Sequence, residues 1–132
     1  MKWSSEIMSL EEANFLKERA YSFFDEAKRL FAERKYDLSS FMLEQACQIF
    51  LKYHLLIKVG TYPRTHSLSR LIQELAKLMP EVLDILKRRA VELGSLEDAY
   101  IASRYLPRRY SKEEIERLML TAEELFGVLT HE

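Results

Sequence analysis

Apolar residues recur three and four positions apart along most of the chain, the spacing of α-helices that bury one side. The first run starts at Ala13 and predicts a long helix with one apolar stripe facing a core. Its apolar positions are Leu16, Ala20, Phe23, Phe24, Ala27, Leu30 and Phe31. Charged residues such as Arg19 and Glu26 lie off this stripe and are expected to face solvent.

The second run, from Leu38 to Ile57, has the same period but carries apolar residues on other faces as well. Leu43, Cys47 and Leu51 lie outside its main stripe. An apolar circumference this wide indicates a helix at the centre of the molecule or one shared with a partner subunit.

Shorter periodic runs follow over residues 68–78, 82–93 and 115–129, and a short helix is expected before the break at Pro107. No stretch alternates polar and apolar residues for long enough to demand a strand. The pattern predicts an all-α, up-and-down bundle of about five helices. Its two long helices form an antiparallel hairpin through residues 34–37.

Helix start and stop signals divide the chain further. A hydroxyl residue stands three positions before a carboxylate at 9–12, 95–98 and 111–114, which predicts three capped helix starts. Gly60 and Gly94 each follow an apolar run and are expected to close helices, while Pro80 suits a first helical turn.

Composition narrows the class of protein. A chain of 132 residues with 48% hydrophobic and 31% charged residues suits one globular domain over 1–132. Its 20 basic and 21 acidic residues give a net charge of −1, so an anion site has to be local. No apolar run approaches the roughly 20 residues of a membrane span, and a cytoplasmic location is expected. Cys47 is the single cysteine and only three histidines accompany it, so no disulfide, metal site or cofactor is predicted.

The most informative local sequence is the segment from Arg104 to Tyr110 around Pro107. Arginine presents a fork of donors suited to phosphate, and a tyrosine ring is a surface on which a base can stack. Three arginines close together repel one another and call for an anion. The predicted ligand-binding residues here are Arg104, Tyr105, Arg108, Arg109 and Tyr110.

Two other polar groups are weaker candidates. Glu44, Gln45, Gln48 and Lys52 are spaced three and four apart, and their simpler interpretation is a solvated helix face. Gln45 falls within the apolar stripe and would need buried partners. His66 lies in the loop before the third helix, where it is expected either to cap or anchor the loop or to contact phosphate.

Three segments taken together resemble a HEPN domain. They are Ser40-Phe-Met-Leu-Glu-Gln-Ala46 with Lys52, Thr65-His-Ser-Leu68 with Leu71, and Asp98-Ala-Tyr-Ile-Ala-Ser-Arg-Tyr105. The resemblance covers roughly residues 10–128 and implies a dimeric bundle of about five helices. It also implies a role beside a small nucleotidyltransferase of the MNT type, and some members of the family are metal-independent endoribonucleases that act as toxins.

The sequence departs from the pattern of the catalytic members, which place a histidine four to six residues after an arginine. Here Arg104 fits the arginine position, but the window where histidine belongs holds Arg109, Tyr110 and Ser111. An arginine stays charged and does not readily assist proton transfer. We therefore predict no catalytic residue and a module that binds nucleotide or RNA, with Lys52 and His66 as further contacts.

Two alternatives stay open. One is a HEPN-type endoribonuclease, the toxin of a toxin–antitoxin pair, in which Arg104 holds the phosphate and Tyr110 or His66 assists. The other is an interaction protein without a small ligand. The predicted partners are a second copy of the chain, a separate nucleotidyltransferase subunit, and a nucleotide or RNA.

Overall fold

The structure is a computed structural model that describes residues 2–105 and 108–130, with side chains for 10–102, 105 and 108–130. All regular elements in these residues are helices. Their bounds are α1 Lys2–Ala32, α2 Tyr36–Val59, α3 Leu68–Ala76, α4 Glu81–Arg88, α5 Ala90–Tyr105 and α6 Lys112–Thr130. The bundle therefore has six described helices where about five were expected.

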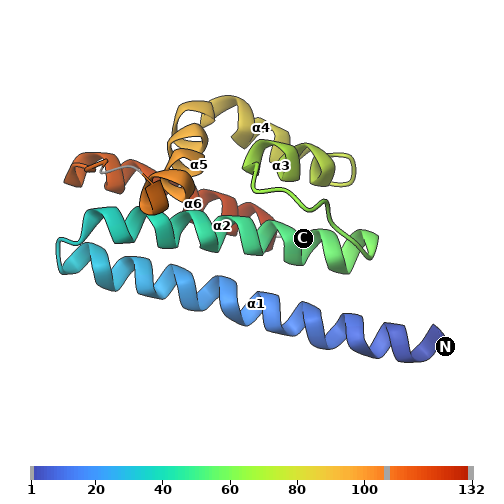
Figure 1. The fold of residues 1–132 in the computed structure, drawn as a ribbon. Coiled ribbons are helices and arrows are strands. Elements are labelled where there is room, and N and C mark those ends of the chain that lie inside the picture. The colour runs from blue at the N-terminus through green and yellow to red at the C-terminus, as the bar shows by residue number, and fades with distance from the viewer. Residues whose placement is uncertain (1, 106–107, 131–132) are drawn as a thin grey trace.

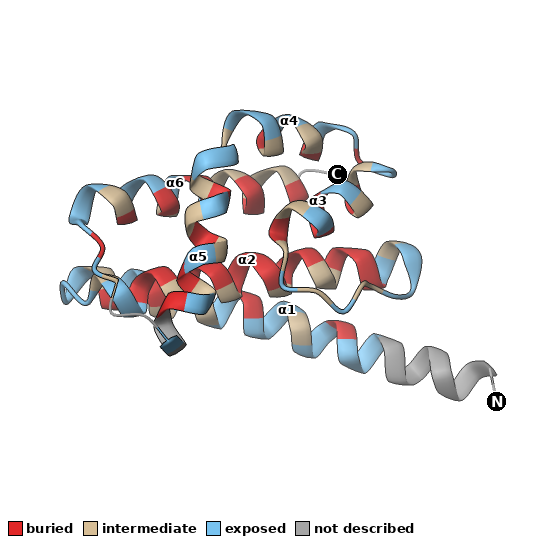
Figure 2. Cartoon of the chain, turned by 45° about the horizontal axis from the view of Figure 1, so that its top comes forward, coloured by how far each residue is buried: buried red, intermediate tan, exposed pale blue. Residues whose placement is uncertain are grey.

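Helix α2 lies at the centre of the molecule. It runs antiparallel to α1 on one side, while α3, α5 and α6 contact it on the others (Figure 1). Figure 2 shows buried residues along most of its length. Neighbouring helices of the same chain thus cover most of the wide apolar circumference of this segment, while Leu38 and Ile57 near its ends stay about half exposed.

The core forms where α1, α2 and α6 meet. The Phe50 ring stacks on Phe126 at a centroid distance of 4.0 Å, and Phe24 meets Phe126 edge-on at 4.8 Å. Leu71, Ile72 and Leu75 of α3 are fully buried on the other side of α2. Cys47 is also fully buried, as expected for a small apolar side chain.

Several predicted helix boundaries are confirmed. Gly60 has a φ of 91° and its N–H bonds Leu56 O at 3.0 Å, which closes α2. At the start of α6, Ser111 N–H donates to Glu114 Oε1 and Glu114 N–H donates to Ser111 Oγ, both at 3.1 Å. This reciprocal pair is a complete capping box.

Three other predicted boundaries are wrong. Residues 9–12 lie inside α1, since the helix already begins at Lys2 and no glycine or proline interrupts the residues before them. Gly94 and Ser95 lie inside α5, so neither ends or begins a helix. Leu93 and Leu96 on either side are buried, and their burial outweighs the roughly 1 kcal/mol cost of a glycine within a helix.

None of the helices in the described residues is both long and apolar enough to cross a bilayer.

Candidate functional site

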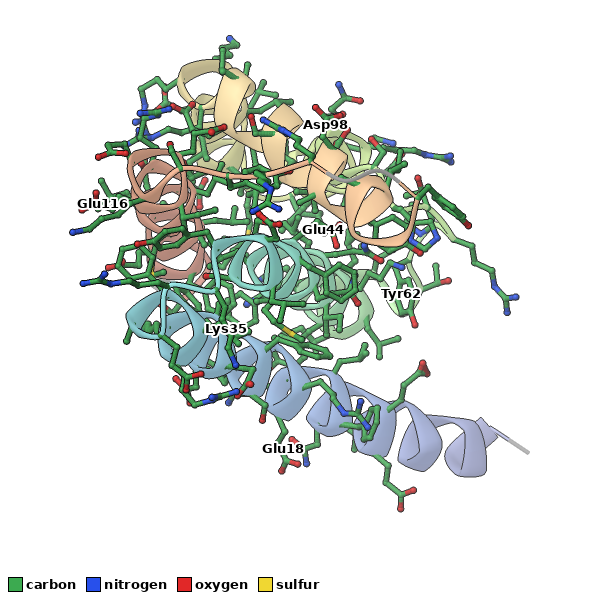
Figure 3. All side chains as sticks on the ribbon, turned by 60° about the vertical axis from the view of Figure 1, so that its left-hand side comes forward. Glu18, Lys35, Glu44, Tyr62, Asp98 and Glu116 are labelled. Atoms are coloured by element: carbon green, nitrogen blue, oxygen red, sulfur yellow. The ribbon has the colours of Figure 1, made fainter. Side chains whose placement is uncertain are left out.

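Two of the polar side chains expected on a solvated face of α2 instead face the interior. Glu44 is fully buried and Gln48 is 5% exposed, because α2 turns this side toward neighbouring helices. Gln48 Nε2 donates to Glu44 Oε2 at 2.8 Å, and Gln45 Nε2 donates to Glu44 Oε1 at 2.7 Å. In Figure 3, Glu44 lies between the ribbons of α2 and α5.

Burial changes the acidity of Glu44. Loss of hydration raises the pKa of its carboxyl group from 4.5 to about 7, and the nearby Glu97 carboxylate adds to this increase. Hydrogen bonds from Gln48 and Gln45 and the charge of Lys52 act in the opposite direction. Glu44 therefore exchanges its proton close to neutral pH.

Lys52 and His66 meet at the amide oxygen of Gln48. Lys52 Nζ donates to Gln48 Oε1 at 3.0 Å, and His66 Nδ1 lies 3.3 Å from the same oxygen. Because Gln48 directs its NH₂ group to Glu44, its oxygen is left to accept from both neighbours. Lys52 is partly buried, and desolvation lowers the pKa of its ammonium group while Glu44 raises it.

His66 also contacts α5. Its Nε2 lies 3.1 Å from the Tyr100 hydroxyl, and the two rings stack at a centroid distance of 4.3 Å. With the proton on Nδ1 for Gln48, Nε2 accepts from the Tyr100 hydroxyl in the neutral ring. His66 is itself exposed, so this nitrogen lies at the edge of the surface.

His66 does not cap α3. That position belongs to Ser67, whose Oγ accepts from Arg70 N–H at 3.2 Å. Glu97 of α5 holds the same turn by accepting from Ser69 N–H at 3.1 Å. His66 thus anchors its loop through side-chain contacts to α2 and α5.

The first part of the arginine and tyrosine segment ends α5. Tyr105 is 75% exposed, whereas the Arg104 side chain lies outside the described residues. The backbone of Arg104 is helical and follows Tyr100 by four positions, so the two positions share one face of α5. Position 104 therefore adjoins the contact between His66 and Tyr100.

Arg108 and Tyr110 pair with each other. The Arg108 guanidinium lies over the Tyr110 ring at 4.2 Å, donates to its hydroxyl at 2.9 Å, and donates to Glu114 at 3.1 Å. Tyr110 is 6% exposed, and burial raises the pKa of its hydroxyl. The ring predicted to stack on a base is thus covered, and the anion that Arg108 requires is the carboxylate of Glu114.

Arg109 is exposed and lies at a different place, beside the turn between α1 and α2. The predicted ligand-binding residues therefore do not form one group. Lys52 and His66 come together with position 104 nearby, Arg108 pairs with Tyr110, and Arg109 stands apart. Their ligand-binding roles stay predictions.

Sequence reasoning missed Glu44, Gln48 and Tyr100 as parts of one network. The available signal was the wide apolar circumference of α2, since polar residues on a central helix have to be buried and bonded. No group of three His, Cys, Asp or Glu side chains that could hold a metal ion occurs among the residues placed in the structure.

Comparison with known families and proteins places this geometry in context. A search of curated proteins gave no match. A family model described as HEPN domain matches residues 13–131, a range that includes the α2 network, the His66 loop and the end of α5. This match spans most of the sequence, and the chain belongs to the HEPN domain family.

Proposed function

We propose that this HEPN domain is a non-catalytic module that binds the phosphate of a nucleotide or RNA and works with a separate MNT-type nucleotidyltransferase. Membership of the family supports a nucleotide- or RNA-related role. The observation that carries the finer proposal is the convergence of Lys52 Nζ and His66 Nδ1 on Gln48 Oε1, beside the face of α5 that holds position 104. We call Lys52, His66, Tyr100 and Arg104 the histidine face.

The charges of this face suit an anion. An ammonium group has three N–H donors, and Gln48 takes one of those of Lys52. When Glu44 holds its proton, which its pKa of about 7 permits near neutrality, it no longer neutralises the positive charge of Lys52. A phosphate is then the favoured counter-ion, because hydrogen bonds between charged groups are the stronger kind.

Aromatic side chains accompany these donors on α2 and α5. The exposed Tyr105 ring ends α5, and the Phe41 and Tyr100 rings stack at a centroid distance of 6.4 Å. Stacking of a base on a tyrosine ring contributes about 1–3 kcal/mol and tolerates any base. The ligand class that fits is therefore a nucleotide or a short stretch of single-stranded RNA.

Binding can be tested with a fluorescent oligoribonucleotide and with ATP by calorimetry. Lys52→Met keeps the apolar stem and removes the charge, and Arg104→Ala removes the arginine. Each is expected to weaken binding by about tenfold or more, the effect of losing one charge-assisted hydrogen bond. Lys77→Met is the matched control, since Lys77 is exposed on the surface and pairs only with Glu74 among the described residues. Equal affinity of wild type and Lys52→Met would contradict the proposal.

One observation favours the ribonuclease as a second candidate. His66 is exposed, and its Nε2 is bonded to the hydroxyl of Tyr100, which shares a face of α5 with position 104, so a group able to transfer a proton lies near that position. Tyr110 is less suitable, because it is buried and bonded to Arg108. RNA cleavage without metal that is lost in both Arg104→Ala and His66→Asn would replace the binding module by this enzyme.

The proposed partners have separate tests. A homodimer should sediment at twice the chain mass of 15.7 kDa. An MNT-type nucleotidyltransferase should co-purify with the wild-type chain when the two are expressed together. If it does not, the binding module acts without that partner.

A further inference from the structure

A basic hollow lies at the start of α2, remote from the histidine face. It has a volume of about 330 Å³ and is bounded by the α1–α2 turn and by the segment that leads into α6. Both bounding segments lie at the left of Figure 1, and Lys35 is labelled at this turn in Figure 3. Three cationic side chains line it: Arg34, Lys35 and Arg109.

Unlike Arg108, the two arginines of this hollow have no carboxylate partner among the described residues. Arg34 and Arg109 are exposed, and neither forms an ion pair within the described residues. Lys35 pairs with Glu33 at 3.3 Å. One carboxylate, Asp37, lines the hollow, and its Oδ1 accepts from Tyr110 N–H at 3.0 Å. Positive charge therefore remains in excess.

Arg34 occupies a position that suits glycine better. Its φ is 62°, in the left-handed region, where its N–H bonds Phe31 O at 3.0 Å and Lys35 N–H bonds Leu30 O at 2.9 Å. These two backbone hydrogen bonds close the C-terminal end of α1, and glycine is the usual residue at the left-handed position of this motif. A long cation held there at a conformational cost points to a use for the side chain.

We propose that this hollow, the turn site, binds a phosphate group through the guanidinium groups of Arg34 and Arg109. Guanidinium forks match the oxygens of phosphate in geometry as well as in charge. The positive end of α2 faces the same hollow and adds to its potential. The turn site is distinct from the histidine face and does not depend on it.

The placement of the two sites limits which ligands reach both. Asp37 and Gln48 lie on nearly the same side of α2, since eleven residues turn an α-helix by slightly more than three full rotations. At about 1.5 Å per residue the sites are roughly 16 Å apart along the axis. A free phosphate or pyrophosphate occupies one site, whereas a short oligonucleotide can contact both.

The test titrates the full chain with sodium pyrophosphate at low ionic strength and follows backbone amides by NMR. Binding should shift the amide signals of Tyr36, Leu38 and Tyr110. Arg34→Gly and Arg109→Ala should each weaken binding by about tenfold or more. Arg34→Gly should at the same time raise Tm, since it relieves the left-handed strain, so weaker binding cannot be ascribed to unfolding.

Two further variants complete the test. Arg70→Ala makes the same change in net charge at an exposed position of α3 and should leave the affinity for pyrophosphate unchanged. Asp37→Asn keeps the acceptor for Tyr110 N–H, removes the opposing charge, and should tighten binding. Failure of wild type to bind pyrophosphate, or equal weakening by Arg70→Ala, overturns the turn site.

A parallel titration with a short oligoribonucleotide identifies the source of the phosphate. If Arg34→Gly weakens oligonucleotide binding as much as it weakens pyrophosphate binding, the site binds the phosphate backbone of a strand. If Arg34→Gly weakens pyrophosphate binding alone, the site binds small phosphates. Either result leaves the histidine face to be judged by Lys52→Met and Arg104→Ala.

Discussion

Two polar regions of the molecule are built in opposite ways. The network of Glu44, Gln48, Lys52 and His66 joins two segments distant in sequence and has its acidic end fully buried. The connection that contains Arg108 and Tyr110 lies near the surface and satisfies its arginine with Glu114, a neighbour only six residues away.

This contrast shows that a cation prominent in the sequence can already be paired in the folded protein. Arg108 belongs to the segment that the sequence marks most clearly as a ligand site, yet its guanidinium already contacts the Tyr110 ring and the Glu114 carboxylate. Lys52 is one lysine among many, but it lies beside a carboxyl group that exchanges its proton near neutrality. Accessibility and partners decide which cation is free to bind an anion.

The largest expected effect comes from breaking the buried network at its centre. Gln48→Leu retains the volume but removes the partner shared by Glu44, Lys52 and His66, and should lower the free energy of unfolding by about 4 kcal/mol at pH 8. Urea denaturation measures this value. Gln73→Leu, the same exchange at an exposed position of α3, should change it by less than about 0.5 kcal/mol. Similar losses in both variants would show that the network is not specially stabilising.

Next in size is the pH dependence that Glu44 introduces. Because burial raises its pKa to about 7 from 4.5, the folded state holds the proton more tightly than the unfolded state. This contribution to stability is complete below about pH 4.5, is lost as pH rises to about 7, and amounts to about 3 kcal/mol.

Denaturation curves between pH 5 and 8 measure this slope, which Glu44→Gln should remove. Carboxyl groups paired with arginine titrate lower, as at Glu124, where Arg88 holds the pKa below its usual range. Glu116→Gln, at an exposed position of α6, should keep the slope. A slope unchanged in Glu44→Gln would mean that another group causes it.

Within the arginine-rich connection, two neighbouring residues should behave differently. Arg108→Ala deprives Tyr110 and Glu114 of a shared donor and should cost about 1 kcal/mol of stability. Arg109→Ala, at an exposed side chain without an ion pair among the described residues, should change stability by less than about 0.5 kcal/mol. Thermal and urea denaturation of both variants provide the comparison, which equal losses would contradict.

The smallest expected effect is a gain in stability. Arg34→Gly removes left-handed strain of about 1–2 kcal/mol but makes the unfolded chain more flexible, so the net gain should be about 0.5–1 kcal/mol. Denaturation in urea measures it. A loss of stability would mean that the Arg34 side chain contributes to the fold.

Much of the fold could be predicted because it depends on local patterns. The periodic apolar residues around Phe24 and Phe50 placed the two long helices, and the hydroxyl and carboxylate of Ser111 and Glu114 marked the start of α6. The helix end predicted at Gly94 is wrong because the cost of a glycine within a helix, about 1 kcal/mol, is smaller than the stabilisation from burying Leu93 and Leu96.

The candidate site was predicted less completely. Lys52 and His66 were both named from the sequence, but their shared contact with Gln48 depends on how the loop before α3 returns to α2. Glu44 and Gln48 were assigned to a solvated face because spacing within one helix does not show which neighbours cover it. Arg34 was not considered, since nothing local relates it to Arg109.

The sequence by itself determined an all-helical chain with a central second helix, because helical periodicity and end signals act between residues a few positions apart. Only the tertiary structure decided that Glu44 is buried, that Arg108 is paired, and that Arg34 and Arg109 line one hollow. These outcomes depend on hydration and on charges brought together from distant segments, and a one-dimensional pattern contains neither.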